Sequence, residues 1–218
     1  FFPTRRSSDL IWLDVDAKLR DLSRGKHSID DFAKASFGMN DGDWGVNTYV
    51  FEDVVKTLND IQPYDWNSYL RMRLDGHGPL IGGVEGHGWK LVYDDKPSDM
   101  VKAIEARRHS ADLTYSIGLS IGKSGAIGDV LWDSPAFKAG ISPGMTVVAV
   151  NNHEYDADAL KDAITAAAKD KSQPVELLVK NFDEYKTVRI DYHGGLKYPH
   201  LVRDDSKPDT LGKLLKAR

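Results

Sequence analysis

The chain of 218 residues carries a formal net charge of −4, and 41% of its residues are hydrophobic, which is ordinary for a globular protein long enough for two small domains. Its 29 Lys and Arg residues are scattered rather than gathered in a stripe, which disfavours nucleic acid as a partner, and no apolar run approaches the roughly 20 residues of a membrane-spanning helix. The absence of cysteine excludes disulfides and thiolate metal sites but leaves the cellular compartment open.

The first ten residues, FFPTRRSSDL, begin without methionine and join abruptly to an amphipathic helical pattern at Ile11. Such a decapeptide is typical of a translated sequencing-adapter junction, and foreign segments do not belong in fold reasoning. We therefore predict that residues 1–10 are not native and expect the native protein to continue upstream of Ile11.

Residues 11–108 are predicted to form a mainly helical domain, because apolar residues recur there at helical spacing. The run from Ser28 to Asp31 is a capping box, and Asp65 can cap a further helix. A glycine-rich loop then leads to a short strand expected at residues 89–93, and a last helix is expected over residues 98–108.

The segment from Gly128 to Asn152, GDVLWDSPAFKAGISPGMTVVAVNN, places a strand, a short apolar helix, a glycine turn and a second strand in that order. Asp156 can cap a second helix, and closing strands are expected at residues 175–179 and 187–190. The apolar face predicted for that second helix consists of Leu160, Ala163, Ile164 and Ala167.

This order of elements, from residue 109 to residue 193, resembles the PDZ domains of bacterial proteases. The resemblance implies a small β-barrel or sandwich with two helices, so the fold class expected for the whole chain is α+β. Upstream of Gly128 lies a hydrophobic-Gly-hydrophobic turn that looks like the carboxylate-binding loop of such domains, in which backbone N–H groups form an anion nest. The residues of this turn are Ser116, Ile117, Gly118 and Leu119, with serine in the place of the usual first glycine.

In PDZ domains of this kind, a peptide or protein C-terminus adds as a strand to the sheet. The resemblance therefore implies a partner peptide beside residues 119–121, with Ala157 and Lys161 facing it from the second helix. The alternative is a PDZ domain that only packs against its neighbour.

Two helical stretches, IWLDVDAKLRDLSRGKHSIDDFAKASFG and YVFEDVVKTLNDIQPYDWNSYLRMRLDG, resemble the C-terminal part of the catalytic unit in glycyl aminopeptidase-type zinc metallopeptidases. In that family a PDZ domain follows in the same order, so the resemblance covers nearly all of residues 11–218. It includes the tail, residues 194–218, where Leu211, Leu214 and Leu215 suggest a short docking helix. It implies a peptidase parent whose zinc is held by an HExxH helix and a downstream glutamate.

The zinc motif itself is not found in this sequence. HExxH needs two histidines one helical turn apart, and although His153-Glu154 begins a match, Ala157 stands at the second histidine position. We therefore assign no catalytic residue, no metal ligand and no cofactor to this chain. Zinc is expected in the upstream catalytic domain, which would be a partner of these residues. The histidines are expected in exposed loops, and the acidic pair Asp14 and Asp16 on solvated surface.

Two functions remain from the sequence. In the first, the chain is a C-terminal fragment of a zinc aminopeptidase that supplies a helical subdomain and a PDZ module. In the second, it is a freestanding peptide-binding adaptor without enzymatic activity.

Overall fold

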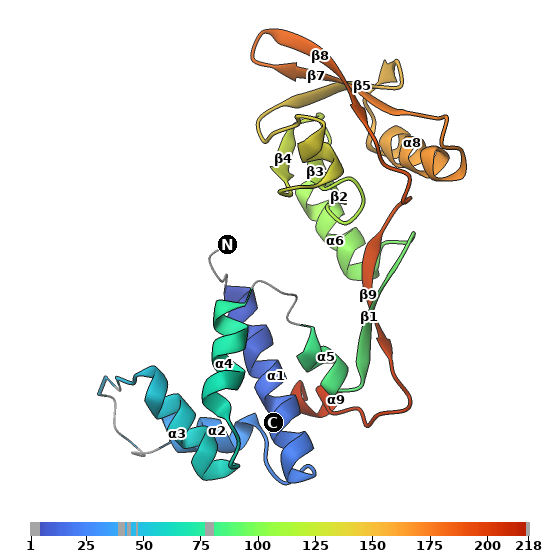
Figure 1. Cartoon of the computed structure of the whole chain (residues 1–218). Helices are drawn as coiled ribbons and strands as arrows, with labels where there is room; N and C mark the ends of the chain where they lie inside the picture. Colours follow the sequence, from blue (N-terminus) through green and yellow to red (C-terminus); the bar gives the residue numbers. More distant parts are fainter. Residues whose placement is uncertain (1–4, 39–41, 43–44, 47, 77–80, 217–218) are drawn as a thin grey trace. The chain divides into compact units, whose positions relative to one another are not determined.

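The computed structural model describes residues 5–38, 42, 45–46, 48–76 and 81–216, and it combines helices with β-sheets (Figure 1). The chain divides into two compact units, one formed by residues 1–91 with 201–218 and the other by residues 92–200. The mixed α and β content agrees with the expected class. The boundary predicted after residue 108 lies inside the second unit, and the end of the tail belongs to the first.

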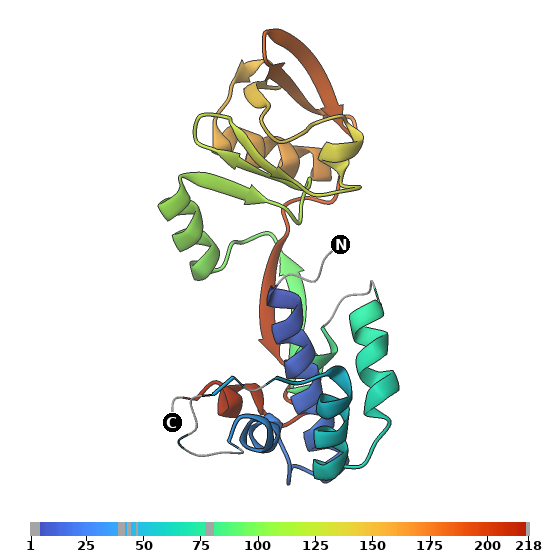
Figure 2. The same ribbon diagram turned by 90° about the vertical axis from the view of Figure 1, so that its left-hand side faces the viewer.

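The first unit is mainly helical. Its helices are α1 (Arg5–Ser23), α2 (Ile29–Phe37), α3 (Phe51–Ile61), α4 (Trp66–Asp75), α5 (Gly82–Gly86) and α9 (Leu211–Leu214). Helix α1 is the longest of these, and it contacts α2 and α5 (Figures 1 and 2). The capping box predicted at Ser28 and Asp31 is confirmed, as is the cap at Asp65, whose carboxylate accepts a hydrogen bond from Ser68 N.

The core of the first unit is a cluster of side chains from α1 to α4. Its buried members are Ile11, Val15, Leu19, Phe32, Leu58, Trp66, Tyr69 and Leu70. Trp66 and Tyr69 meet edge to face with ring centroids 5.5 Å apart, a geometry that adds to the stabilisation from burial. These contacts between helices stabilise the first unit, and no member of the described cluster comes from a strand.

Strands β1 (Trp89–Asp94) and β9 (Tyr198–Arg203) pair with each other in a two-stranded sheet. The chain passes from the first unit to the second within β1 and returns within β9. The strand predicted at residues 89–93 is thus confirmed, whereas its partner in the tail was not predicted.

The second unit contains two sheets. In the first, strands β2 (Ser110–Leu113), β3 (Leu119–Gly122) and β4 (Ile127–Val130) lie in the order β2-β3-β4. In the other, strands β5 (Thr146–Val150), β6 (His153–Glu154), β7 (Val175–Asn181) and β8 (Glu184–Ile190) lie in the order β6-β5-β7-β8. Neighbouring strands are antiparallel in both sheets, and the helices are α6 (Asp99–Arg108), α7 (Pro135–Lys138) and α8 (Ala157–Lys169), as Figures 1 and 2 show.

One buried cluster joins both sheets of the second unit to α8. The predicted apolar face of α8 is confirmed, since Leu160, Ala163, Ile164 and Ala167 are all buried in it. The helix caps at Ser98, Ser134 and Asp156 are formed by their side chains.

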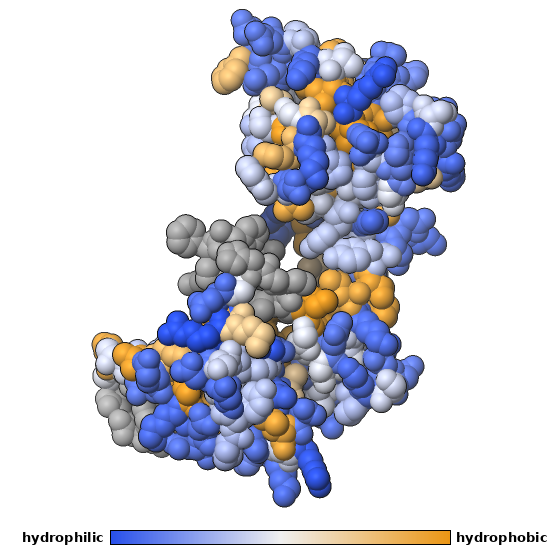
Figure 3. Space-filling model, viewed as in Figure 1, coloured by the Kyte–Doolittle hydropathy of each residue, from blue (hydrophilic) through white to orange (hydrophobic). Residues whose placement is uncertain are grey.

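None of the helices among the described residues is both long and apolar enough to cross a membrane. In the space-filling view most of the visible surface is hydrophilic, with smaller hydrophobic patches (Figure 3).

Candidate functional site

The turn between β2 and β3 carries three of the six residues predicted to bind a peptide, and a fourth, Leu119, begins β3. Gly118 adopts a φ of +86°, and a Cβ atom there would collide with the side chain of Ser134, so only glycine fits without strain. The carbonyls of Ile117 and Gly118 accept hydrogen bonds from Ala136 N (2.9 Å) and Leu131 N (2.7 Å). The turn is therefore held firmly against the start of α7.

Serine at the first position of this turn does not distort it. Ser116 is absent from the described residues that have positive φ, so glycine is not required there. Its side chain is buried, and its Oγ accepts a hydrogen bond of 3.0 Å from Lys197 N. Serine thus ties the turn to the segment that leads into β9.

Two of the backbone N–H groups of the turn already have an acceptor within the chain. Ser116 N and Gly118 N donate to the carbonyl oxygen of Leu113, at 3.1 and 3.0 Å. Leu113 is the last residue of β2, so an oxygen of the chain itself lies where the sequence predicted the carboxylate of a partner peptide.

Both edges of β3 are hydrogen-bonded. On one edge β3 pairs with β4, and on the other it pairs with β2 in the register Leu113 opposite Leu119 and Ala111 opposite Ile121. The peptide addition predicted beside residues 119–121 would therefore require β2 to leave that edge.

Lys161 of α8, which was predicted to face a bound peptide, has a partner within the chain. Its ammonium lies 3.3 Å from Glu105 Oε2, while Glu105 Oε1 accepts a hydrogen bond of 2.7 Å from Asp112 N. One carboxylate thus joins α8 to the backbone of β2. Ala157, in the first turn of α8, is half-buried and packs against the core of the unit.

Tyr198 lies near the same acidic groups, Glu105 and Asp112. Its ring is buried, and burial, together with the negative charges of Glu105, Asp112 and Asp158, raises its pKa to about 12. Its hydroxyl has no hydrogen-bond partner in the structure. The phenol therefore stays neutral at physiological pH.

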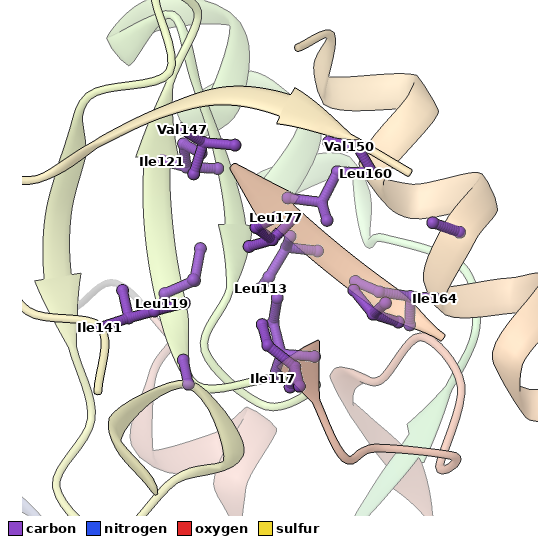
Figure 4. Close-up of a cluster of buried hydrophobic side chains, with 14 of the residues drawn as sticks. Leu113, Ile117, Leu119, Ile121, Ile141, Val147, Val150, Leu160, Ile164 and Leu177 are labelled. Carbon is purple, nitrogen blue, oxygen red and sulfur yellow. The ribbon is translucent and has the colours of Figure 1, made fainter. Parts of the chain in front are cut away.

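Figure 4 shows buried side chains of the second unit, which come from both sheets and from α8. In this view Leu113 lies between Leu119 of β3 and Ile164 of α8, with Ile117 close to it. All four side chains belong to the same buried cluster, and the exposed fraction of Leu113 is 0%. We call the combination of the β3 edge, the turn 116–118 and the facing residues of α8 the β3–α8 site.

A second cluster of ionisable groups lies in the helical unit and corrects a sequence-based expectation. Asp14 and Asp16 were expected on solvated surface, but both are buried. Asp14 pairs with Arg73, and its backbone carbonyl accepts from the Tyr69 hydroxyl at 3.2 Å. Asp16 accepts from Arg20 Nε at 2.6 Å. Each of these carboxylates is therefore paired with an arginine inside the fold rather than solvated.

His87, expected in an exposed loop, is fully buried beside this cluster. Its Nδ1 lies 2.7 Å from Thr210 Oγ1, and its Nε2 lies 3.1 Å from the carbonyl oxygen of Leu13 and 3.4 Å from Asp16 Oδ2. Burial lowers its pKa, although the nearby Asp16 carboxylate acts in the opposite direction. The ring therefore links α1 to the C-terminal segment as a neutral imidazole. His77, also expected in a loop, lies outside the described residues.

No group of three or more His, Cys, Asp or Glu side chains in the described parts of the chain is placed to hold a metal ion. His153 lies exposed in β6 and not on a helix. The described residues thus do not fit a zinc ion. A pocket of about 370 Å³ in the helical unit is lined by the aromatic side chains Trp12, Phe32, Phe37 and Tyr49 together with polar residues.

The sequence matches no family model and no curated protein. Among solved structures, the chain is similar to an aminopeptidase N family protein from Idiomarina loihiensis, with 17% identity and a TM-score of 0.56. That match covers 97% of this chain and 36% of the other, so the chain spans about a third of that protein's length. The HtrA3 PDZ domain bound to a phage-derived ligand, FGRWV, also matches, with 17% identity over 60% of this chain and all of that domain, at a TM-score of 0.27. At these identities the first likeness concerns the fold alone.

Proposed function

We propose that this chain is a non-catalytic portion of a zinc-dependent aminopeptidase of the glycyl aminopeptidase type, and that it supplies a helical subdomain and a PDZ-type module. The observation that carries the proposal is the fold similarity to an aminopeptidase N family protein, which extends over 97% of this chain and therefore includes both units. The order of helical stretches and PDZ-like segment in the sequence supports the same assignment.

The PDZ assignment of residues 109–193 is supported by local features. A glycine turn with buried hydrophobic neighbours precedes β3, the capped helix α7 follows β4, and α8 lies beside the same core. In the proposed role, the PDZ-type module shapes and supports the peptidase, because its main peptide-binding edge is already paired with β2.

A freestanding peptide-binding adaptor is the weaker candidate for that reason. An adaptor needs an open edge to which a partner strand can add. In this chain both edges of β3 are paired.

The decisive test is to sequence the source DNA upstream of the codon for Ile11. An upstream in-frame HExxH motif followed by a glutamate ligand would support the proposal, and an authentic start codon there would contradict it. The purified chain is also expected to be inactive toward aminoacyl p-nitroanilides. Chelator-sensitive hydrolysis by the chain alone would refute the non-catalytic role.

A further inference from the structure

We propose that residues 110–113 are an internal ligand of the β3–α8 site, and that this site accepts a free peptide C-terminus with an aliphatic last residue once β2 has left. The proposal goes beyond the function proposed above and does not depend on it. It rests only on contacts within residues 92–200.

The main-chain hydrogen bonds of β2 resemble those that a bound peptide would make with its C-terminal residues. A peptide that adds to a sheet edge pairs with the edge strand and can place its terminal carboxylate on a nest of N–H groups. Strand β2 runs antiparallel to β3 and ends at the turn, where the Leu113 carbonyl oxygen accepts from Ser116 N and Gly118 N. Leu113 therefore takes the position of a terminal residue.

The side chains of β2 define what the site selects. They alternate, because successive residues of a strand point to opposite faces. Ala111 and Leu113 are 3% and 0% exposed and belong to the core cluster, whereas Ser110 and Asp112 are half-buried. The space at the turn thus suits an aliphatic last residue, and the space two residues earlier suits a small one.

Glu105 holds this internal ligand in place. The Asp112 N–H is bonded to the Glu105 carboxylate, which also pairs with Lys161 of α8. Both Glu105 and Lys161 are mostly buried, so water screens this pair less than a surface ion pair. Glu105 therefore links the occupied edge to the helix opposite it.

The covalent connection makes β2 a strong competitor. A segment joined to its site by a short connection acts at an effective concentration on the order of millimolar. With a micromolar intrinsic affinity of β2 for the open site, about one molecule in 1,000 is open, so the binding of a free peptide is weakened by roughly 1,000-fold. We therefore expect the wild-type chain to bind such peptides only weakly.

The test compares two full-length variants that differ in which face of β2 receives a new charge. Ala111→Asp places a carboxylate in the core and expels β2, whereas Ser110→Asp places it on the half-buried outer face and serves as the control. The probe is a fluorescein-labelled peptide with the sequence of residues 106–113, ARRHSADL, and a free carboxylate, measured by fluorescence anisotropy. The expected result is binding to Ala111→Asp at least about tenfold tighter than to wild type or to Ser110→Asp. The same peptide with a C-terminal amide should bind more weakly, because it cannot place a charge on the nest.

Hydrogen exchange by mass spectrometry makes the outcome decisive. If Ala111→Asp keeps wild-type protection in β5, β7 and β8 but does not bind the peptide, the proposal is overturned. If the variant loses protection throughout, the wild-type chain provides the test. Millimolar peptide should then speed exchange in residues 110–113 while residues 119–122 stay protected, and unchanged exchange in residues 110–113 would overturn the proposal. Neither result affects the sequencing test of the aminopeptidase assignment.

Discussion

Shortening Leu113 to alanine measures how firmly β2 is built into the second unit. Leu113 is fully buried in the cluster that joins both sheets to α8. Leu113→Ala removes three carbon atoms, and at about 0.8 kcal/mol for each buried methylene the transfer contribution is about 2.4 kcal/mol. The cavity left behind adds to this, so we expect the unfolding free energy of the second unit to fall by about 3 kcal/mol.

The two units need not unfold together, so the assay must report on the second unit alone. Hydrogen exchange of the β7 and β8 amides meets this need, because their slowest protons exchange through unfolding of the whole unit. A loss of about 3 kcal/mol speeds their exchange on the order of 100-fold.

The matched control is Leu131→Ala, since Leu131 is 46% exposed in the same unit. Its effect should stay within about 0.5 kcal/mol. A loss below about 1 kcal/mol for Leu113→Ala would show that Leu113 is not packed in the folded core, and the argument that β2 occupies the β3–α8 site would fail with it.

Three further outcomes are expected. In urea unfolding, Gly118→Ala should lower the unfolding free energy of the second unit by at least about 2 kcal/mol more than Gly144→Ala does. Both glycines have positive φ, but only a Cβ at Gly118 meets Ser134, so equal losses would contradict the collision. Burial lowers the pKa of His87 below its unfolded value of 6.5, so the unfolded state binds the extra proton first as the pH falls. The unfolding free energy of the helical unit should therefore decline below about pH 6.5 with a slope that His87→Gln reduces, and an unchanged slope in urea titrations would refute this. Tyr198→Phe should leave stability unchanged or raise it in thermal unfolding, because the hydroxyl is buried without a partner among the described residues; a marked loss of stability would reveal a hydrogen bond to that hydroxyl. In ultraviolet absorbance it should remove one of the two tyrosines, Tyr155 and Tyr198, whose pKa is raised to about 12.

The elements with local signals could be predicted from the sequence. The capping box at Ser28 and the helix caps at Asp65 and Asp156 depend on residues only a few positions apart, and all three occur in the structure. The apolar face of α8 was also predicted, because helical periodicity records which side of a helix is buried.

The sequence analysis named candidate residues for the site, but it did not predict that β2 pairs with β3 there. The turn 116–118 and Lys161 do lie at one site, since the glycine turn and the helix periodicity placed each of them. Nothing in the short run Ser110–Leu113 shows that it pairs with β3, because four residues carry too little periodicity to distinguish an edge strand from a loop.

The sequence by itself thus determined the capped starts of several helices and the buried face of α8, because these follow from interactions between neighbours along the chain. It did not determine that α1 begins at Arg5 or that α5 forms within the expected glycine-rich loop. Tertiary structure alone decided the burial of Asp16 and His87, the pairing of β9 with β1 and the filling of the β3–α8 site by β2. These features depend on which distant segments meet, and a buried charge such as that of Asp14 is tolerated only where a partner such as Arg73 is brought to it by the fold.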